Sequence, residues 1–211
     1  PTYAGAHCTL GILLSESGHA TEGTQRIDLA VRLEPTNVIF QVERAQIHAL
    51  LGERERARAI LAEVAARAGP AACIVGETRI AVWWNDREMA ARCAATIEAQ
   101  PGEASWKAAS GLMRAVAEDQ PFPEIEETLA ALTDPRCAPR HRARMLSIAT
   151  ECNARAGRLE EAFASLALQA QLPFIDLLWM DHCPPLEVMR ADPRFSEARA
   201  TVAARAAELW A

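Results

Sequence analysis

The chain has 211 residues, of which half are hydrophobic but only 5% are aromatic, and its formal net charge is −6. Mild acidity argues against a general DNA- or RNA-binding surface, which needs a basic patch, and no apolar run approaches the roughly 20 residues that cross a bilayer. Alanine dominates the apolar residues and is accompanied by Leu, Glu and Arg, which lose little side-chain freedom in a helix, so an all-α fold is predicted.

A motif made of a turn residue, a charged run and a small residue recurs along the chain. The turn residue is Gly18, then Gly52 thirty-four residues later, then Asn85 and Gly157. A small residue stands five positions after each of them, at Gly23, Ala57, Ala90 and Ala162. A second marker keeps nearly the same period, because successive units end at Pro35, Gly69–Pro70, Pro101 and Pro135. We therefore predict a helical repeat of about 34 residues.

Each part of the motif has a physical reason. Gly18 and Gly52 are expected to end a first helix, because Gly accepts the left-handed conformation that follows a helix. The charged run begins a second helix, the small residue lets the two helices approach closely, and proline ends the second helix. One hairpin cannot bury its apolar stripe alone, so neighbouring hairpins must stack. In the fourth unit the turn is altered to the stretch 119–123.

The repeat pattern stops after Leu172-Pro173-Phe174. A segment containing Trp179 leads to Cys183-Pro184 and then to Asp192-Pro193-Arg194-Phe195. The last helix is predicted from Ser196 to Trp210, with Ser196 as its N-cap residue.

Together these motifs resemble the tetratricopeptide repeat (TPR) family. The first unit is the most similar, with Leu10-Gly11, Gly18, Ile27, Ala30 and Pro35 at the family's characteristic positions. The resemblance implies a right-handed α-α superhelix, with about five degenerate hairpins over residues 1–175 and capping helices over 176–211. The tail is similar to the segment that follows TPR arrays in bacterial multidomain signalling proteins, which carry a Ser/Thr kinase, adenylate-cyclase or transcription-activator domain upstream.

The resemblance implies a non-catalytic interaction or scaffold module, which would be the regulatory or docking part of a larger bacterial signalling protein. The chain has no starting Met and no secretory signal, so we expect a piece of a longer cytoplasmic protein. Its partner would be another protein or peptide, or an upstream domain of the same chain, and no nucleic acid, membrane or cofactor is expected. Two alternatives stay open: a domain of a transcription activator that senses a ligand or inhibitor, and a self-association module that forms a homo-oligomer.

In the family, fixed positions of each first helix face a concave groove. Ile39 and Val75 fall on such positions, and the residues expected to bind a partner there are Ile12, Glu16, Val42, Gln46, Arg79, Val82, Trp83, Leu112 and Glu151. The groove is predicted to be apolar in its middle, with Arg79 and Glu151 as isolated charges. It would hold an apolar or amphipathic helix of a partner, or else be partly filled by the chain's own segments. Trp83-Trp84 would be a binding anchor or would pack in the core.

Catalytic and metal-binding chemistry is not expected. The six cysteines, at positions 8, 73, 93, 137, 152 and 183, form no C-x-x-C pair, so we predict reduced core residues and no metal. Asp181-His182-Cys183 offers a nucleophile beside a base, but adjacent residues rarely reach the geometry that catalysis needs. Glu126-Glu127 and Glu160-Glu161 are interpreted as solvated helix faces.

Overall fold

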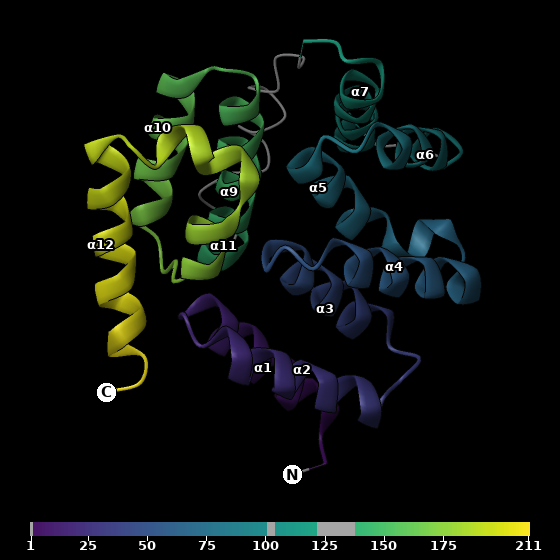
Figure 1. The fold of residues 1–211 in the computed structure, drawn as a ribbon, viewed down its shortest axis with the longest axis horizontal. Coiled ribbons are helices and arrows are strands. Elements are labelled where there is room, and N and C mark those ends of the chain that lie inside the picture. Colours follow the sequence, from purple (N-terminus) through teal and green to yellow (C-terminus); the bar gives the residue numbers. More distant parts are fainter. Residues whose placement is uncertain (1, 101–103, 122–137) are drawn as a thin grey trace. The chain divides into compact units, whose positions relative to one another are not determined.

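The computed structural model describes residues 2–100, 104–121 and 138–211, and every regular element among these residues is a helix (Figure 1). The all-α prediction is therefore confirmed for the described part of the chain. The elements are α1 (Ala4–Glu16), α2 (Ala20–Leu33), α3 (Val38–Leu50), α4 (Arg54–Ala68), η1 (Pro70–Cys73), α5 (Ile74–Trp84), α6 (Arg87–Glu98), α7 (Ala104–Glu118), α9 (Pro139–Arg155), α10 (Leu159–Ala170), α11 (Leu177–His182), η2 (Pro184–Met189) and α12 (Pro193–Glu208).

Some predictions fall outside the described residues. These are the prolines at positions 101 and 135, Cys137, Glu126-Glu127 and the end of the altered turn at 122–123.

The chain divides into two compact units, which are described separately. Unit 1 comprises residues 1–77, 175–183 and 206–211, and unit 2 comprises residues 78–174 and 184–205. Each unit thus combines predicted repeats with parts of the predicted capping tail.

The same helix-ending turn occurs five times. A residue with positive φ stands at Gly18 (92°), Gly52 (80°), Asn85 (51°), Asp119 (57°) and Gly157 (73°), at intervals of 34, 33, 34 and 38 residues. After each of them, the next backbone N–H donates to the carbonyl five residues earlier, over 2.8 to 3.1 Å. This is the bond that closes a Schellman motif. The turn predicted at Gly18, Gly52, Asn85 and Gly157 is confirmed, and Asp119 has the same role in the altered fourth turn.

Side chains cap the first turns of several helices. The Oδ1 atom of Asn37 accepts from the Ile39 N–H at 3.1 Å at the start of α3, and Asp86 accepts from the Met89 N–H at 3.0 Å at the start of α6. The prediction that Ser196 begins the last helix is wrong. Helix α12 begins at Pro193, and the Asp192 carboxylate accepts from the Arg194 N–H at 2.9 Å. Proline is favoured in the first helical turn, because its missing N–H has no partner there.

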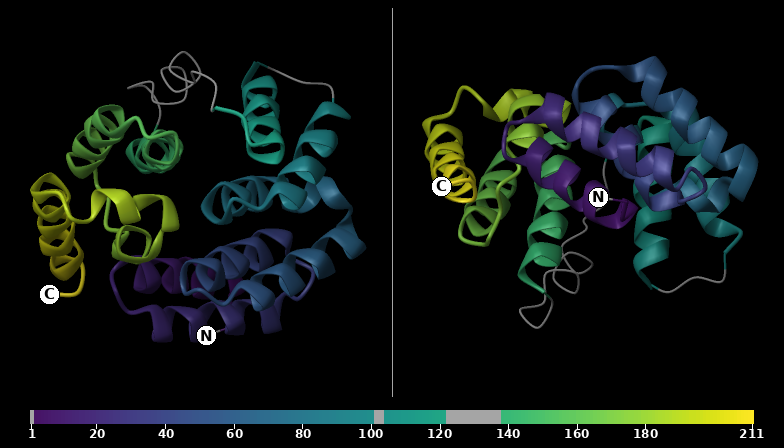
Figure 2. Two further views of the ribbon diagram at one scale, coloured as in Figure 1. Left: turned by 45° about the horizontal axis from the view of Figure 1, so that its top comes forward. Right: turned by 90° about the horizontal axis from the view of Figure 1, so that it is seen from below.

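The small residues of the motif allow close contact within each hairpin. In unit 1, a Cβ atom on Gly23 would lie 2.6 Å from the carbonyl oxygen of Gly11, so α1 and α2 touch backbone to backbone (Figure 2). Ala57, Ala90 and Ala162 are fully buried at the equivalent positions. The predicted reason for a small residue is therefore confirmed at Gly23, and the burial of the three alanines agrees with it.

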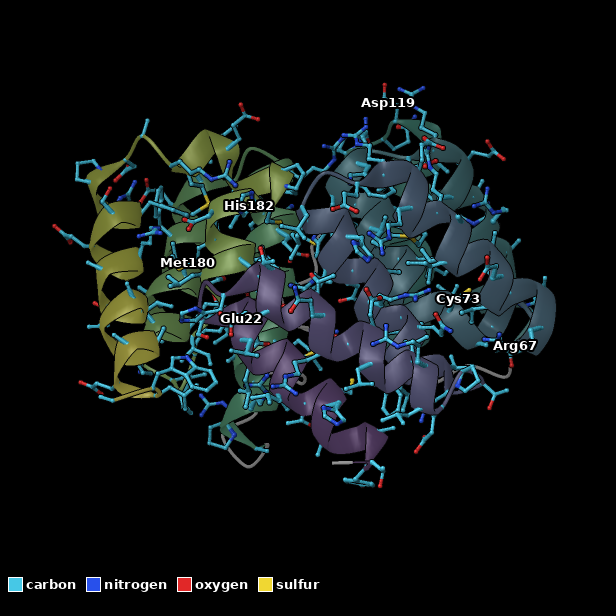
Figure 3. All side chains as sticks on the ribbon, turned by 60° about the horizontal axis from the view of Figure 1, so that its bottom comes forward. Glu22, Arg67, Cys73, Asp119, Met180 and His182 are labelled. Atoms are coloured by element: carbon cyan, nitrogen blue, oxygen red, sulfur yellow. The ribbon has the colours of Figure 1, made fainter. Side chains whose placement is uncertain are left out.

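The tail contributes to unit 1 through α11 and the C-terminal residues. Helix α11 packs against α1 and α3, and its Trp179 and Met180 are fully buried, whereas His182 at its end is exposed (Figure 3). Trp210 Nε1 donates to Ser17 Oγ at 2.9 Å, and the Trp210 ring lies edge-on to that of His19 at 6.1 Å. The C-terminus is thereby attached to the turn that joins α1 and α2.

Other tail residues belong to unit 2. Arg194 pairs with Asp192 and with Glu160 on α10, both at 2.9 Å, and its guanidinium stacks 3.8 Å from the centre of the Phe163 ring. These bonds lower the pKa of both carboxyl groups. Arg205 donates to the Ala170 carbonyl at 2.9 Å, at the end of α10, and to the Phe174 carbonyl at 2.8 Å, in the segment that follows this helix.

Candidate functional site

The predicted groove residues of unit 1 are only partly accessible. Ile12 and Glu16 on α1 are half-buried, while Val42 and Gln46 on α3 are buried. Val42 and Gln46 are buried because the first turn of α5 packs on them. A Cβ atom on Gly76, in that turn, would lie 2.6 Å from Val42 Cγ1 and 3.5 Å from Gln46 Nε2. The next repeat therefore covers these two side chains.

The predicted groove residues of unit 2 are mostly internal. Val82 and Trp83 on α5 and Glu151 on α9 are buried, and only Leu112 on α7 and Arg79 on α5 are half-buried. These side chains contribute to the packing of the unit in the conformation described.

Arg79 and Glu151 were expected to be isolated charges, and this prediction is wrong. Arg79 Nη2 and Nε both donate to Glu151 Oε1, at 2.6 and 3.0 Å, although the residues are 72 positions apart in the sequence. The side chains are only 11% and 1% exposed. Burying either charge alone would be costly, because a charge taken out of water needs a partner of opposite sign. The pair joins α5 directly to α9.

Both tryptophans at the end of α5 are buried, with 2% of Trp83 and 9% of Trp84 exposed. The guanidinium of Arg79 lies 5.0 Å from the centre of the Trp83 ring, a distance at which the ring face attracts a cation. Trp83 thus supports the Arg79–Glu151 pair. Of the two alternatives for Trp83-Trp84, a binding anchor or core packing, their burial favours core packing.

Two groove positions remain open to solvent. Ile39, in the first turn of α3, is 67% exposed, and Val75, in the first turn of α5, is 64% exposed. Both lie in unit 1, next to the place where Gly76 contacts Val42. Of the predicted groove, this is the part that presents large apolar side chains.

The described cysteines, at positions 8, 73, 93, 152 and 183, are all buried. Burial raises the pKa of Cys8 to about 11, with a further contribution from the charge of Glu43, and burial also raises the pKa of Cys152. Both side chains are therefore held as neutral thiols.

The described residues offer neither a metal site nor a membrane-spanning helix. No group of three His, Cys, Asp or Glu side chains there could hold a metal ion. None of the helices among those residues combines the length and the apolar character needed to span a membrane.

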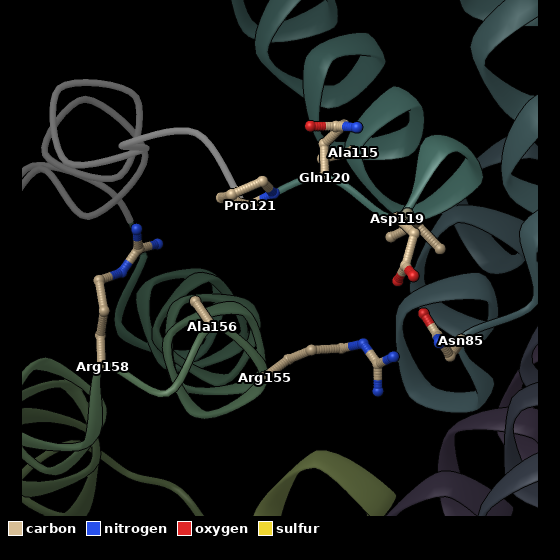
Figure 4. Close-up of a pocket in the computed structure, with 9 residues that line it drawn as sticks. Asn85, Ala115, Asp119, Gln120, Pro121, Arg155, Ala156 and Arg158 are labelled. Atoms are coloured by element: carbon tan, nitrogen blue, oxygen red, sulfur yellow. The ribbon is translucent and has the colours of Figure 1, made fainter.

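Unit 2 contains a polar cleft of about 380 Å³ that was not predicted from the sequence. It lies where α5, α7 and α9 end, and Figure 4 shows Arg155 extending across it toward Asn85 and Asp119. The sequence signal was present, since Asn85, Asp119 and Gly157 are equivalent turn residues. Their convergence in space could not be inferred, because it depends on how the hairpins pack.

Comparison of the chain with protein-family models, with curated proteins and with solved structures gave no match.

Proposed function

We propose that this chain is a TPR-type helical-repeat module that binds a segment of another protein and has no catalytic role. The observation that carries the proposal is the helix-ending turn that recurs five times at intervals close to 34 residues. Stacked hairpins of this kind characteristically present extended surfaces for protein partners.

The binding surface is assigned to Ile39 and Val75. Other predicted groove residues are engaged internally, as in the buried Arg79–Glu151 pair of unit 2. Ile39 and Val75 are both more than 60% exposed, and large apolar side chains at the start of successive hairpins suit the apolar face of a partner helix.

The test is capture of binding proteins by the immobilised chain and by an Ile39→Glu/Val75→Glu variant. Both positions are exposed, so the variant should remain folded, whereas glutamate at Val42 or Val82 would be placed in the core. Leu168→Glu is the matched control, because Leu168 on α10 is 56% exposed but lies on the second helix of its hairpin. We expect a partner that is retained by the wild type and the control and lost by the double variant.

Three results would count against this proposal. Capture that survives Ile39→Glu/Val75→Glu would exclude the assigned surface, and the absence of any partner would leave the binding function without support. A mass that rises with protein concentration and returns to that of a monomer in the double variant would instead identify a second copy of the chain as the occupant.

A further inference from the structure

The cleft in unit 2 is built from three equivalent turns. Asn85 follows α5, Asp119 follows α7, and Ala156 and Gly157 follow α9. The N–H groups of Asp86, Gln120 and Arg158 each close a turn by donating to the carbonyl five residues earlier. The backbone of the cleft wall is therefore fixed by hydrogen bonds. The residues that line it are Asn85, Ala115, Val116, Asp119, Gln120, Pro121, Arg155, Ala156 and Arg158.

Among the described residues that line the cleft, the charged side chains are those of two arginines and one aspartate. Arg155 and Arg158 line it together with one carboxylate, that of Asp119. That carboxylate already has a cation, because Arg87 Nη2 lies 2.5 Å from Asp119 Oδ2. The Asp119 carboxylate is therefore already paired, and its charge acts only in part on Arg155.

Arg155 is a lining cation that no side chain in the described part of the chain pairs with directly. Its guanidinium makes no hydrogen bond or close ion pair with any residue in the described ranges, and its side chain is half-buried. Burial lowers its pKa, and the charge of Asp119 only partly offsets this effect. A partly desolvated cation without an acceptor is unfavourable, and a bound anion would remove the imbalance.

The remaining lining residues suit a small organic molecule. The side-chain amides of Asn85 and Gln120 can donate or accept hydrogen bonds, and Arg158 is oriented by a 3.0 Å bond from its Nε to Asn153 Oδ1. Ala115, Val116 and Ala156 provide apolar contacts beside these groups. The volume falls within the range of about 300–1,000 Å³ typical of small-molecule sites.

We propose that this cleft binds a small organic oxyanion, a carboxylate or phosphate ester, with Arg155 as the residue that contacts the charged group. The planar guanidinium can donate two parallel hydrogen bonds to either kind of group. The site lies in unit 2 and does not depend on the surface of Ile39 and Val75, so either proposal can fail without the other.

Isothermal titration calorimetry of the whole chain would test the site. The probes are glucose 6-phosphate and tricarballylate, with inorganic phosphate to measure the contribution of the bare anion and glucose as the neutral control, all at equal ionic strength. We expect one of the two organic anions to bind and glucose not to bind. Which of them binds more tightly distinguishes a phosphate site from a carboxylate site.

Three variants make the test specific. Arg155→Gln should weaken binding at least tenfold, and Arg155→Lys should weaken it less, because it keeps the charge but loses the planar fork. Arg92→Gln removes an exposed arginine on α6 that pairs with Glu88 at 3.1 Å, away from the cleft lining, and should bind as the wild type does. Circular dichroism should show unchanged helix content in all three.

The proposal is overturned if neither organic anion binds up to about 10 mM, well above a millimolar dissociation constant. It is also overturned if Arg155→Gln binds the preferred anion as tightly as Arg92→Gln does. Inorganic phosphate binding as tightly as both organic anions would likewise contradict it, because the neutral part of the cleft would then contribute nothing.

Discussion

At the scale of single residues, the recurring turn depends on a backbone conformation that most amino acids avoid. Gly adopts positive φ without a steric penalty, whereas a Cβ atom there approaches the carbonyl oxygen. Three of the five turns use Gly, and the other two use Asn85 and Asp119, whose short polar side chains tolerate this conformation better than others do. The turn is thus kept in the repeats that have Asn or Asp in place of Gly, although the sequence motif is harder to recognise there.

Replacing Gly52 by alanine should destabilise the fold by about 1 kcal/mol, because a Cβ atom is unfavourable at positive φ. No atom lies within 4 Å of the added methyl group, so the effect would come from the backbone alone. Gly111, inside α7, also has open space around it, and there alanine should stabilise the helix by about 0.5–1 kcal/mol. Thermal denaturation of the two variants should therefore shift in opposite directions, and shifts of the same sign would contradict the assigned turn.

Removing the carboxylate of Glu151 should cost about 3–5 kcal/mol, because Arg79 would be left as a buried charge without its partner. The variants to compare are Glu151→Ala and the double variant Arg79→Met/Glu151→Leu, which replaces the pair with apolar side chains and should recover much of the loss. Glu98→Ala breaks a pair with Arg114 in which the side chains are 40% and 54% exposed, and should change little. If Glu151→Ala and Glu98→Ala unfold at the same temperature, the pair does not stabilise the unit.

At the scale of the helical elements, each hairpin is determined by local signals and completed by burial. The α3–α4 hairpin of unit 1 shows both. The Asn37 side chain caps its start, Gly52 forms its turn, and Ala57 lets its helices approach. His48, in the last turn of α3, is fully buried, and its Nδ1 atom lies 3.1 Å from Glu53 Oε2. The hairpin therefore encloses a side chain whose ordinary pKa in water lies near neutral pH.

The α3–α4 hairpin should lose stability as the pH falls below about 6.5, the ordinary pKa of histidine. Burial, and next the charge of Arg56, lower the pKa of His48 in the folded chain, against opposing contributions from Glu53 and Asp28. The unfolded chain therefore binds a proton at a higher pH than the folded chain, and acidification favours unfolding until the pH is below the folded-state pKa.

The change in thermal midpoint between pH 7.5 and 5.5 measures this effect. It should be smaller in His48→Leu than in the wild type, because leucine fills the buried site without taking up a proton. Equal changes in both proteins would show that His48 does not contribute to the pH dependence.

At the scale of the whole molecule, the two compact units are discontinuous in sequence. Unit 1 takes residues 175–183 and 206–211 from the tail, while residues 184–205 belong to unit 2. Each unit therefore combines residues of the repeats with residues of the tail. The tail is better described as shared packing than as a separate structure, and its removal should affect both units.

Deleting residues 206–211 should destabilise unit 1 locally. The deletion removes Trp210, whose Nε1 donates a partly buried hydrogen bond to Ser17 Oγ, and such a bond contributes on the order of 1 kcal/mol. Hydrogen exchange followed by mass spectrometry should show severalfold faster exchange around the turn between α1 and α2. Peptides of the turn between α9 and α10 in unit 2 serve as the internal control and should exchange as before. Equal acceleration in both turns would mean that the C-terminus does not act on unit 1 specifically.

The sequence alone determined the helical class, the period, and the turns at Gly18, Gly52, Asn85 and Gly157. It did so because these features depend on interactions within a few residues: φ preference at a helix end, side-chain caps and the missing N–H of proline. The start of the last helix was predicted three residues too late, at Ser196 instead of Pro193. Both residues are local signals for a helix start, Ser196 as an N-cap and Pro193 as a first-turn proline.

Only the tertiary structure decided which predicted groove residues are accessible. Arg79 and Glu151 are 72 positions apart, and no local pattern indicates that they would pair rather than stand apart. No local pattern indicates that Gly76 packs on Val42 and buries it. Nor does any local pattern indicate the cleft in which Arg155 faces Asn85 and Asp119. Helical periodicity specifies which face of a helix a residue occupies. Whether that face contacts another helix or solvent depends on how one hairpin packs on the next.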